Sequence, residues 1–208
     1  TLGVSYKTAW FMAHRIREAM DVKPTGPLGS GGKPVEVDET YWGHKPAFKL
    51  ARKGRSRPNL KMQVVSLIER GGEARSFHVV NVDAKNVAKI MREQIAKDAH
   101  LMTDESRIYI KVGREFQDHS TVNHSRKEYA RGNAHVNSAE SFFNIFKRGL
   151  AGTFHHIGEQ HLQRYLREFD FRFNNRAALG VNDQQRADKA LKGISGKRLT
   201  YRRTDKTA

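Results

Sequence analysis

Three acidic residues stand where their carboxylates could act together on a phosphodiester: Asp38, Asp104 and Glu140. Asp38 lies in the alternating, β-prone segment 35–42, and Asp104 closes the short apolar segment 100–104. Glu140 falls in the first turn of a helix whose predicted N-cap is Asn137 or Ser138. Carboxylate oxygens are hard ligands that suit Mg²⁺ or Mn²⁺ better than zinc. Two such ions can activate a water or a 3′-hydroxyl group and stabilise the leaving oxygen of a phosphodiester.

Spacing alone leaves two interpretations of these acids open. The chain has 22 Asp and Glu, so three of them can fall near strand and helix ends by chance. The doublets Asp38-Glu39 and Asp104-Glu105 also leave open which side chain points inward, because neighbours in a strand face opposite ways. Converging carboxylates repel one another and would be poorly stable without cations. That repulsion favours a functional site over a packing feature.

The composition favours a polyanion as partner. The 208-residue chain has 38 Lys and Arg against 22 Asp and Glu, a formal net charge of +16. It has no cysteine, which excludes disulfides, cysteine-bound zinc and thiol nucleophiles. No apolar run reaches about 18 residues and no signal peptide opens the chain, so we expect no membrane partner. The length suits one domain of ordinary size with small appendages.

The hydrophobic pattern predicts the elements that position the acids. Alternation predicts strands, and apolar residues three and four apart predict helices. The predicted strands cover residues 35–42, 62–68, 74–82, 100–104 and 120–124. The predicted helices cover residues 8–20, 84–97, 105–113, 137–150 and 159–174, the last with an apolar stripe that we assign to the core.

This order of elements is that of the RNase H-like fold, in which a three-stranded meander precedes alternating helices and strands. We therefore predict an α/β protein: an RNase H-like mixed five-stranded sheet flanked by helices, with a short N-terminal helical segment. In that fold the first and fourth strands are neighbours. Asp38 and Asp104 would then converge, and Glu140 would approach from a helix at the side.

A basic segment, residues 43–61, joins the first two predicted strands. It contains no acid and seven cations: Lys45, Lys49, Arg52, Lys53, Arg55, Arg57 and Lys61. A charge run is often only a solvated face, but so many cations beside the first strand favour contact with a DNA backbone. Neutralising phosphates gives affinity without sequence information. The C-terminal segment from residue 181 is also basic and is predicted to be loose.

The blocks that contain the three acids resemble the catalytic blocks of DDE transposases. They read Val-Glu-Val-Asp-Glu-Thr-Tyr-Trp-Gly at 35–43, Leu-Met-Thr-Asp-Glu at 101–105 and His-Val-Asn-Ser-Ala-Glu-Ser-Phe-Phe-Asn-Ile-Phe-Lys-Arg-Gly at 135–149. The specific resemblance is to bacterial insertion-sequence transposases related to the eukaryotic Merlin elements. Further matching blocks follow in the same order, at residues 122–125, 152–156, 162–165 and 168–176. The resemblance as a whole spans roughly residues 1–180.

The resemblance implies cleavage of DNA at the ends of a transposable element and transfer of the 3′-hydroxyl strand into target DNA, with two Mg²⁺ or Mn²⁺ ions. By position, Asp38, Asp104 and Glu140 would be the metal ligands. Some members of the group have Asn at the third position, which makes Asn137, on the same helix face, a second candidate. Lys147, two helical turns after Glu140, would hold a DNA phosphate near the metals, with Arg148 beside it.

The resemblance also implies partners and a domain plan. The partner would be double-stranded DNA, at both transposon ends and target, bound by a homodimer or higher assembly on the nucleoid, in the bacterial cytoplasm. Residues 1–21 would be the C-terminal part of a helix-turn-helix DNA-binding region, 22–34 a linker, 35–180 the catalytic domain and 181–208 a basic tail. The residues of the N-terminal helix, taken alone, fit an N-terminal packing helix equally well. We therefore expect the chain to be part of a longer protein.

Two other functions stay open on the sequence. An RNase H-like nuclease, such as a junction resolvase, would share the acids. A non-catalytic DNA-binding protein derived from a transposase would share the charge.

Overall fold

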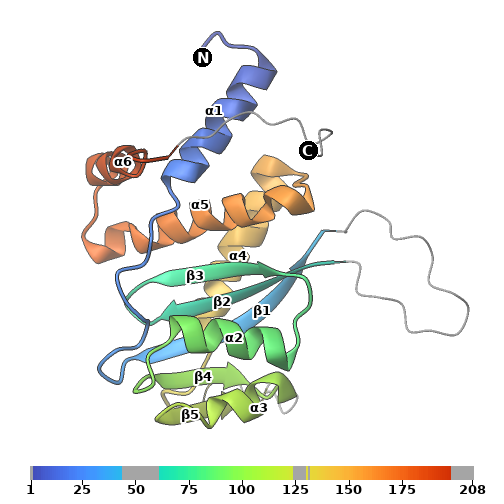
Figure 1. The fold of residues 1–208 in the computed structure, drawn as a ribbon, viewed down its shortest axis with the longest axis vertical. Coiled ribbons are helices and arrows are strands. Elements are labelled where there is room, and N and C mark those ends of the chain that lie inside the picture. The colour runs from blue at the N-terminus through green and yellow to red at the C-terminus, as the bar shows by residue number, and fades with distance from the viewer. Residues whose placement is uncertain (1, 44–60, 124–129, 131, 198–208) are drawn as a thin grey trace, which may run out of the picture.

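A five-stranded mixed sheet forms the centre of the protein in a computed structural model that describes residues 2–43, 61–123, 130 and 132–197 (Figure 1). The order across the sheet is β3-β2-β1-β4-β5, with β2 antiparallel to β1 and β3, and β4 parallel to β1 and β5. This arrangement confirms the predicted RNase H-like fold class. The strands are β1 (Pro34–Trp42), β2 (Met62–Glu69), β3 (Ala74–Val79), β4 (His100–Asp104) and β5 (Asp118–Val122).

Two helical layers cover the sheet, one on each face (Figure 1). On one face lie α2 (Ala84–Gln94) and α3 (Arg107–Gly113). On the other lie α4 (Asn137–Gly149) and α5 (Leu162–Asn174), joined by a π-helical turn, Leu150–Phe154, and a 3₁₀ turn, Glu159–His161. Two large apolar cores result, because β2 sends alternate side chains to opposite faces of the sheet. A third, small cluster contains Val122, Ala134 and Val136.

The apolar stripe of α5 packs into the second of these cores, as its spacing predicted. Leu162 and Leu166 have no exposed surface, and Phe169 packs edge-on against Phe146 of α4 at a ring-centroid distance of 5.1 Å. Burying each such side chain contributes about 1.5–3 kcal/mol. The two helices are therefore held to the sheet and to each other by aromatic packing.

Helix α1 (Tyr6–Ala19) packs against α5 through a buried ion pair. Arg17 Nε donates to Glu168 Oε2 at 2.8 Å, and its guanidinium lies over the ring of Tyr165, 4.0 Å from the centroid. Arg167 of α5 adds a more exposed pair with Asp21, 3.1 Å apart. Arg17 is therefore committed to α5 and is not available as a surface cation.

Four differences from the predicted elements have a clear cause, and the other ends are displaced by at most three residues, as in α3, which begins at Arg107 instead of residue 105. β3 ends at Val79, three residues early, because Val79 pairs with Gln63, the second residue of β2, and the pairing ends there. β5 begins two residues early, at Asp118, since it pairs along the whole of β4. α2 ends at Gln94, where the chain turns to form a bridge with Leu28 of the predicted linker.

The fourth difference is a helix in the segment predicted to be loose. α6 (Asp183–Lys192) begins with a capping box, in which Asn182 and Gln185 each bond the backbone N–H of the other. A short 3₁₀ turn, Ala177–Leu179, precedes it. In the described part of the chain, no helix has both the length and the apolar character needed to cross a membrane.

Candidate active site

The sheet directs Asp38 and Asp104 toward one face. The parallel pairing of β1 with β4 runs from Pro34 and His100 to Glu36 and Met102. Asp38 and Asp104 each follow two residues after the last pair, so their side chains point to the same side as those of Glu36 and Met102. Residues opposite each other on adjacent strands face the same side of a sheet. The two carboxylates therefore share one face.

That face is the one covered by α4. Val35 and Val37 of β1 point into the core beneath α2 and α3, whereas Glu36 binds the start of α4. Alternation then directs Asp38 toward α4 and Glu39 away from it. Glu39 accepts a short hydrogen bond from the hydroxyl of Tyr109, a buried residue of α3. The sequence did not decide which residue of the Asp38-Glu39 pair faces the acid cluster. In the structure Asp38 faces α4 and Glu39 faces α3, on the opposite side of the sheet.

Glu140 completes the cluster from the first turn of α4, where its side chain is exposed. It is near enough to Asp38 to affect its ionisation. Burial is the main cause that raises the pKa of Asp38 from 3.8 to about 7, while the N–H of Glu39 opposes the rise. The neighbouring negative charges raise it further, in the order Glu39, Asp104 and Glu140.

The donor set of this cluster suits a hard divalent cation. All three side chains are carboxylates, and like charges in a half-buried site favour cation binding. Within the residues that the structure describes, no three acid or histidine side chains are gathered into a ready-made metal site. The sheet and α4 therefore bring the three residues to one face, and their carboxylates would have to draw closer to hold an ion.

The other predicted site residues fall into two groups. Asn137 is exposed at the start of α4, and Lys147 and Arg148 lie near its end, half-buried and exposed. Seven residues separate Lys147 from Glu140, so both lie on one side of the helix. The predicted DNA-binding cations of the basic segment lie outside the described residues: Lys45, Lys49, Arg52, Lys53, Arg55 and Arg57.

Sequence reasoning missed Glu36, the residue that connects β1 to α4. It has no exposed surface, yet its carboxylate binds the backbone at the beginning of α4. A signal was present in the sequence: Glu36 alternates with Asp38, so both must face the same side of the strand. A charged residue at a buried strand position needs partners, and this requirement could have identified it.

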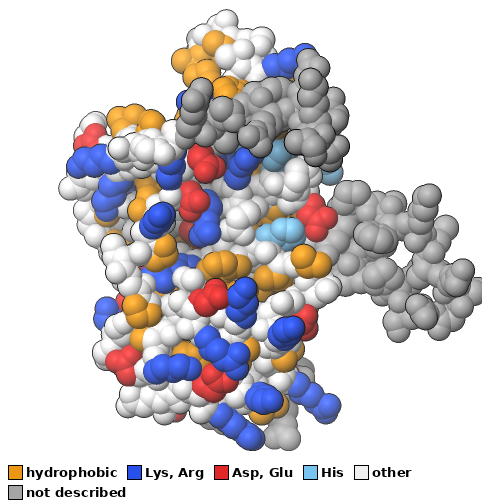
Figure 2. Space-filling view, viewed as in Figure 1, with side chains coloured by type: hydrophobic (Ala, Val, Ile, Leu, Met, Phe, Trp, Pro, Cys, Tyr) orange, Lys and Arg blue, Asp and Glu red, His pale blue; other side chains and the backbone are white. Residues whose placement is uncertain are grey.

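Positively charged side chains also lie on the helical layer formed by α2 and α3. Figure 2 shows Lys and Arg side chains over α2 and α3, with acidic side chains between them. Part of this charge is neutralised locally, since Arg92 and Lys97 both bind Glu115, at 2.6 and 3.4 Å. Arg92 and Glu115 form a two-pronged pair that lowers the pKa of Glu115 to about 2. Arg92 and Lys97 are therefore partly neutralised within the protein.

The fold and the acids define an RNase H-like domain with a carboxylate cluster between the middle of β1, the carboxyl end of β4 and the first turn of α4. Residues 30–174 match the ISXO2-like transposase domain, and the chain belongs to that family. The match covers all three acids and every strand of the sheet.

Two relatives agree with this assignment. A protein of Haemophilus influenzae described as an "uncharacterized transposase-like protein" is 33% identical over 97 residues, which are 47% of this chain and 77% of the relative. A Halobacterium salinarum protein described as lying "in transposable element ISH50" is 27% identical over 192 residues, 82% of this chain and 61% of that relative. No solved structure matches the chain.

Proposed function

We propose that the protein is a DNA transposase that cuts phosphodiester bonds at transposon ends and transfers the 3′-hydroxyl strand into target DNA. The observation that carries this proposal is that the pairing of β1 with β4 directs Asp38 and Asp104 to one face, where Asp104 and Glu140 are both close enough to raise the pKa of Asp38. Membership in the ISXO2-like family supports it. The residues resemble, more narrowly, the insertion-sequence group related to Merlin elements.

In this proposal the three carboxylates hold two Mg²⁺ or Mn²⁺ ions. Bound ions of this kind activate the attacking hydroxyl and stabilise the leaving oxygen. Asp38 and Asp104 contribute from the rigid sheet, and Glu140 contributes from α4. Lys147, on the same side of α4, is suited to bind a DNA phosphate beside them.

The partners follow from the proposed reaction. Double-stranded DNA is the substrate both as transposon end and as target, and paired ends call for a dimer or a higher assembly. Residues 1–21 would continue a helix-turn-helix region that recognises the ends, and residues 35–180 would form the catalytic domain. The reaction would take place on the nucleoid, in the bacterial cytoplasm.

Substitution of the acids tests the proposal. Asp38→Asn, Asp104→Asn and Glu140→Gln are each expected to abolish Mg²⁺-dependent cutting of duplexes that carry the sequences flanking the gene. Binding of the same duplexes in a gel-shift assay should persist. Asn137→Ala, tested in parallel, separates the two candidates for the third metal ligand. If Glu140→Gln keeps full activity and Asn137→Ala loses it, Asn137 and not Glu140 is the third ligand.

Strand transfer separates a transposase from a nuclease with the same acids. A duplex with a pre-cut 3′-end is supplied with a supercoiled plasmid, and joined products are counted. Hydrolysis without joining would favour a resolvase-like nuclease. DNA binding with neither reaction would favour a non-catalytic DNA-binding protein.

A further inference from the structure

Glu36 lies two residues before Asp38 and binds the N-terminus of α4. Its Oε2 atom accepts hydrogen bonds from the backbone N–H groups of Ser138 at 2.7 Å and Ala139 at 3.0 Å. Its Oε1 atom lies 3.1 Å from the hydroxyl of Ser138, which donates to it. These are backbone groups in the first turn of the helix, which cannot find partners within the helix itself.

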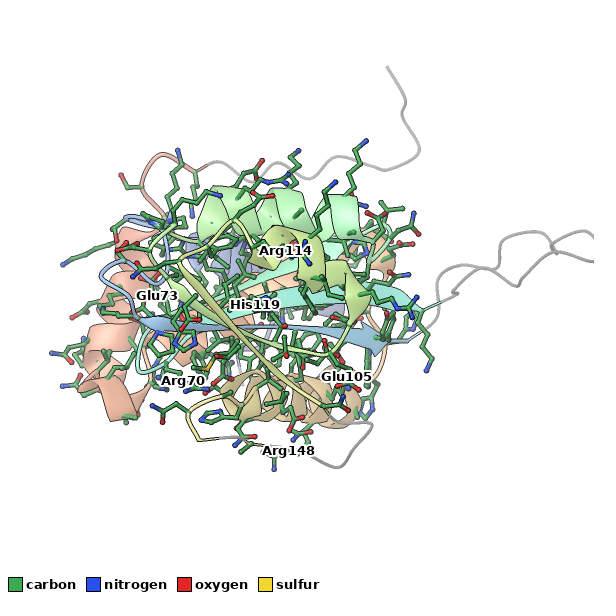
Figure 3. All side chains as sticks on the ribbon, turned by 90° about the horizontal axis from the view of Figure 1, so that it is seen from below. Arg70, Glu73, Glu105, Arg114, His119 and Arg148 are labelled. Atoms are coloured by element: carbon green, nitrogen blue, oxygen red, sulfur yellow. The ribbon has the colours of Figure 1, made fainter. Side chains whose placement is uncertain are left out.

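Arg70, just beyond the end of β2, fixes the other side of the same carboxylate. Its Nε atom donates to Glu36 Oε1 at 2.6 Å. Its two terminal nitrogens donate to the carbonyls of Asn133 and His135 at 2.7 and 2.8 Å. The guanidinium of Arg70 thus connects Glu36 to the segment that leads into α4. Arg70 is labelled in Figure 3.

The side chains next to the start of α4 provide only one weak cap, since the N–H of Asn137 donates to His135 Nδ1 at 3.4 Å. His135 Nδ1 also lies 3.3 Å from Glu36 Oε1, so this local contact leads back to the same carboxylate. The residue at the cap position is Val136, whose side chain cannot accept a hydrogen bond. Glu36 supplies the missing acceptor from a different element, and its negative charge complements the positive end of the helix dipole. The next residue after the two bonded amides is Glu140.

We propose that Glu36 is a positioning residue for the acid cluster. It fixes the first turn of α4 to β1, so that Glu140 is held beside Asp38 on the strand that carries both Glu36 and Asp38. The hydrogen bonds of Glu36 to α4 are independent of the proposed function. The inference rests on that function only where it describes the three acids as a metal-binding site.

Glu36→Gln tests this role with little change in shape. The glutamine side chain keeps one acceptor oxygen, but its N–H₂ group replaces a carboxylate oxygen that accepts hydrogen bonds. The backbone N–H groups of Ser138 and Ala139 should therefore exchange hydrogen about tenfold faster. Mn²⁺ affinity, measured by titration of the metal alone, should fall severalfold. Glu69→Gln is the matched control, because Glu69 accepts from the backbone N–H of Gly29 at 2.9 Å but lies outside α4 and β1. It should leave both readouts unchanged.

A double-mutant cycle separates positioning from a general loss of structure. If Glu36 acts through Glu140, Glu36→Gln should weaken Mn²⁺ binding in the wild-type background but have almost no further effect in Glu140→Gln. Additive losses, or unchanged exchange at the two amides, would overturn the proposal. If Glu36→Gln does not fold, Arg70→Lys enters the same cycle, since it keeps the charge but loses the fork that binds the two carbonyls.

The same measurements distinguish this inference from the proposed function. A wild-type protein that binds Mn²⁺ but cuts no DNA would contradict the transposase activity and leave the positioning role intact. A wild-type protein without Mn²⁺ affinity would contradict the metal site, and hydrogen exchange at Ser138 and Ala139 would then decide alone whether Glu36 holds α4.

Discussion

Replacing Asp38 by Asn should stabilise the metal-free protein at neutral and alkaline pH. The folded protein raises the pKa of this carboxyl from 3.8 to about 7, mainly by burial. The folded state therefore keeps a proton that the unfolded chain releases, and stability declines as the pH rises from about 4 to about 7. The full rise corresponds to an upper limit of about 4 kcal/mol, since one pKa unit equals about 1.4 kcal/mol.

The measured gain should be smaller than this limit, because Asp38 is only partly shielded from water. We expect about 2 kcal/mol at pH 8 and almost none at pH 4. The asparagine oxygen can still accept the hydrogen bond from the N–H of Glu39, so this contact is preserved. Asp170, whose pKa burial also raises to about 7, remains in the variant and keeps part of the pH dependence.

Urea unfolding in the presence of a chelator, at pH 4 and at pH 8, measures the effect. Asp188→Asn is the control, since it makes the same chemical change on the exposed surface of α6. Added Mg²⁺ should stabilise the wild-type protein more than Asp38→Asn, because the variant lacks one carboxylate. A variant no more stable than wild type at pH 8, or equally stabilised at pH 4, would refute this account of the charge cluster.

Three further predictions concern packing, docking and DNA contact. Phe146→Ala should cost about 3–5 kcal/mol in chemical unfolding, whereas Ile145→Ala, on the exposed side of α4, should cost less than about 1. Glu168→Ala leaves the buried Arg17 without its carboxylate and should cost about 3–5 kcal/mol, with faster hydrogen exchange in α1; unaltered exchange there would contradict the docking role of the pair. Charge reversal in the basic segment should weaken binding to all DNA sequences alike and reduce its salt dependence, as measured by titrations at several salt concentrations; equal binding would exclude DNA contact by the substituted residues, Arg52, Lys53 and Arg55.

The elements that the sequence predicted best are those in which periodicity and burial agree. Residues 62–68 read as a strand and form β2, whose residues Met62 to Leu67 are all buried. The α5 stripe read as core and is core, because its apolar residues repeat at helical spacing. The order of these elements was enough to predict the sheet and to place Asp38 near Asp104.

The features that were missed depend on contacts between distant segments. The start of β5 is set by pairing with β4, which leaves no mark on local composition. α6 was hidden by its basic composition, although Asn182 and Gln185 gave a recognisable capping signal. Glu36 was overlooked because its partners, Ser138 and Ala139, lie more than 100 residues away.

The pairing of β1 with β2 makes the acid cluster structurally independent of the length of the basic segment. Trp42 and Met62 are register partners, so the sheet holds the two ends of residues 43–61 side by side. A two-residue hairpin turn could join that pair directly without altering the strands. The architecture therefore allows this segment to be lengthened, shortened or exchanged as a unit during evolution or by design, while the strand that carries Glu36 and Asp38 keeps its register.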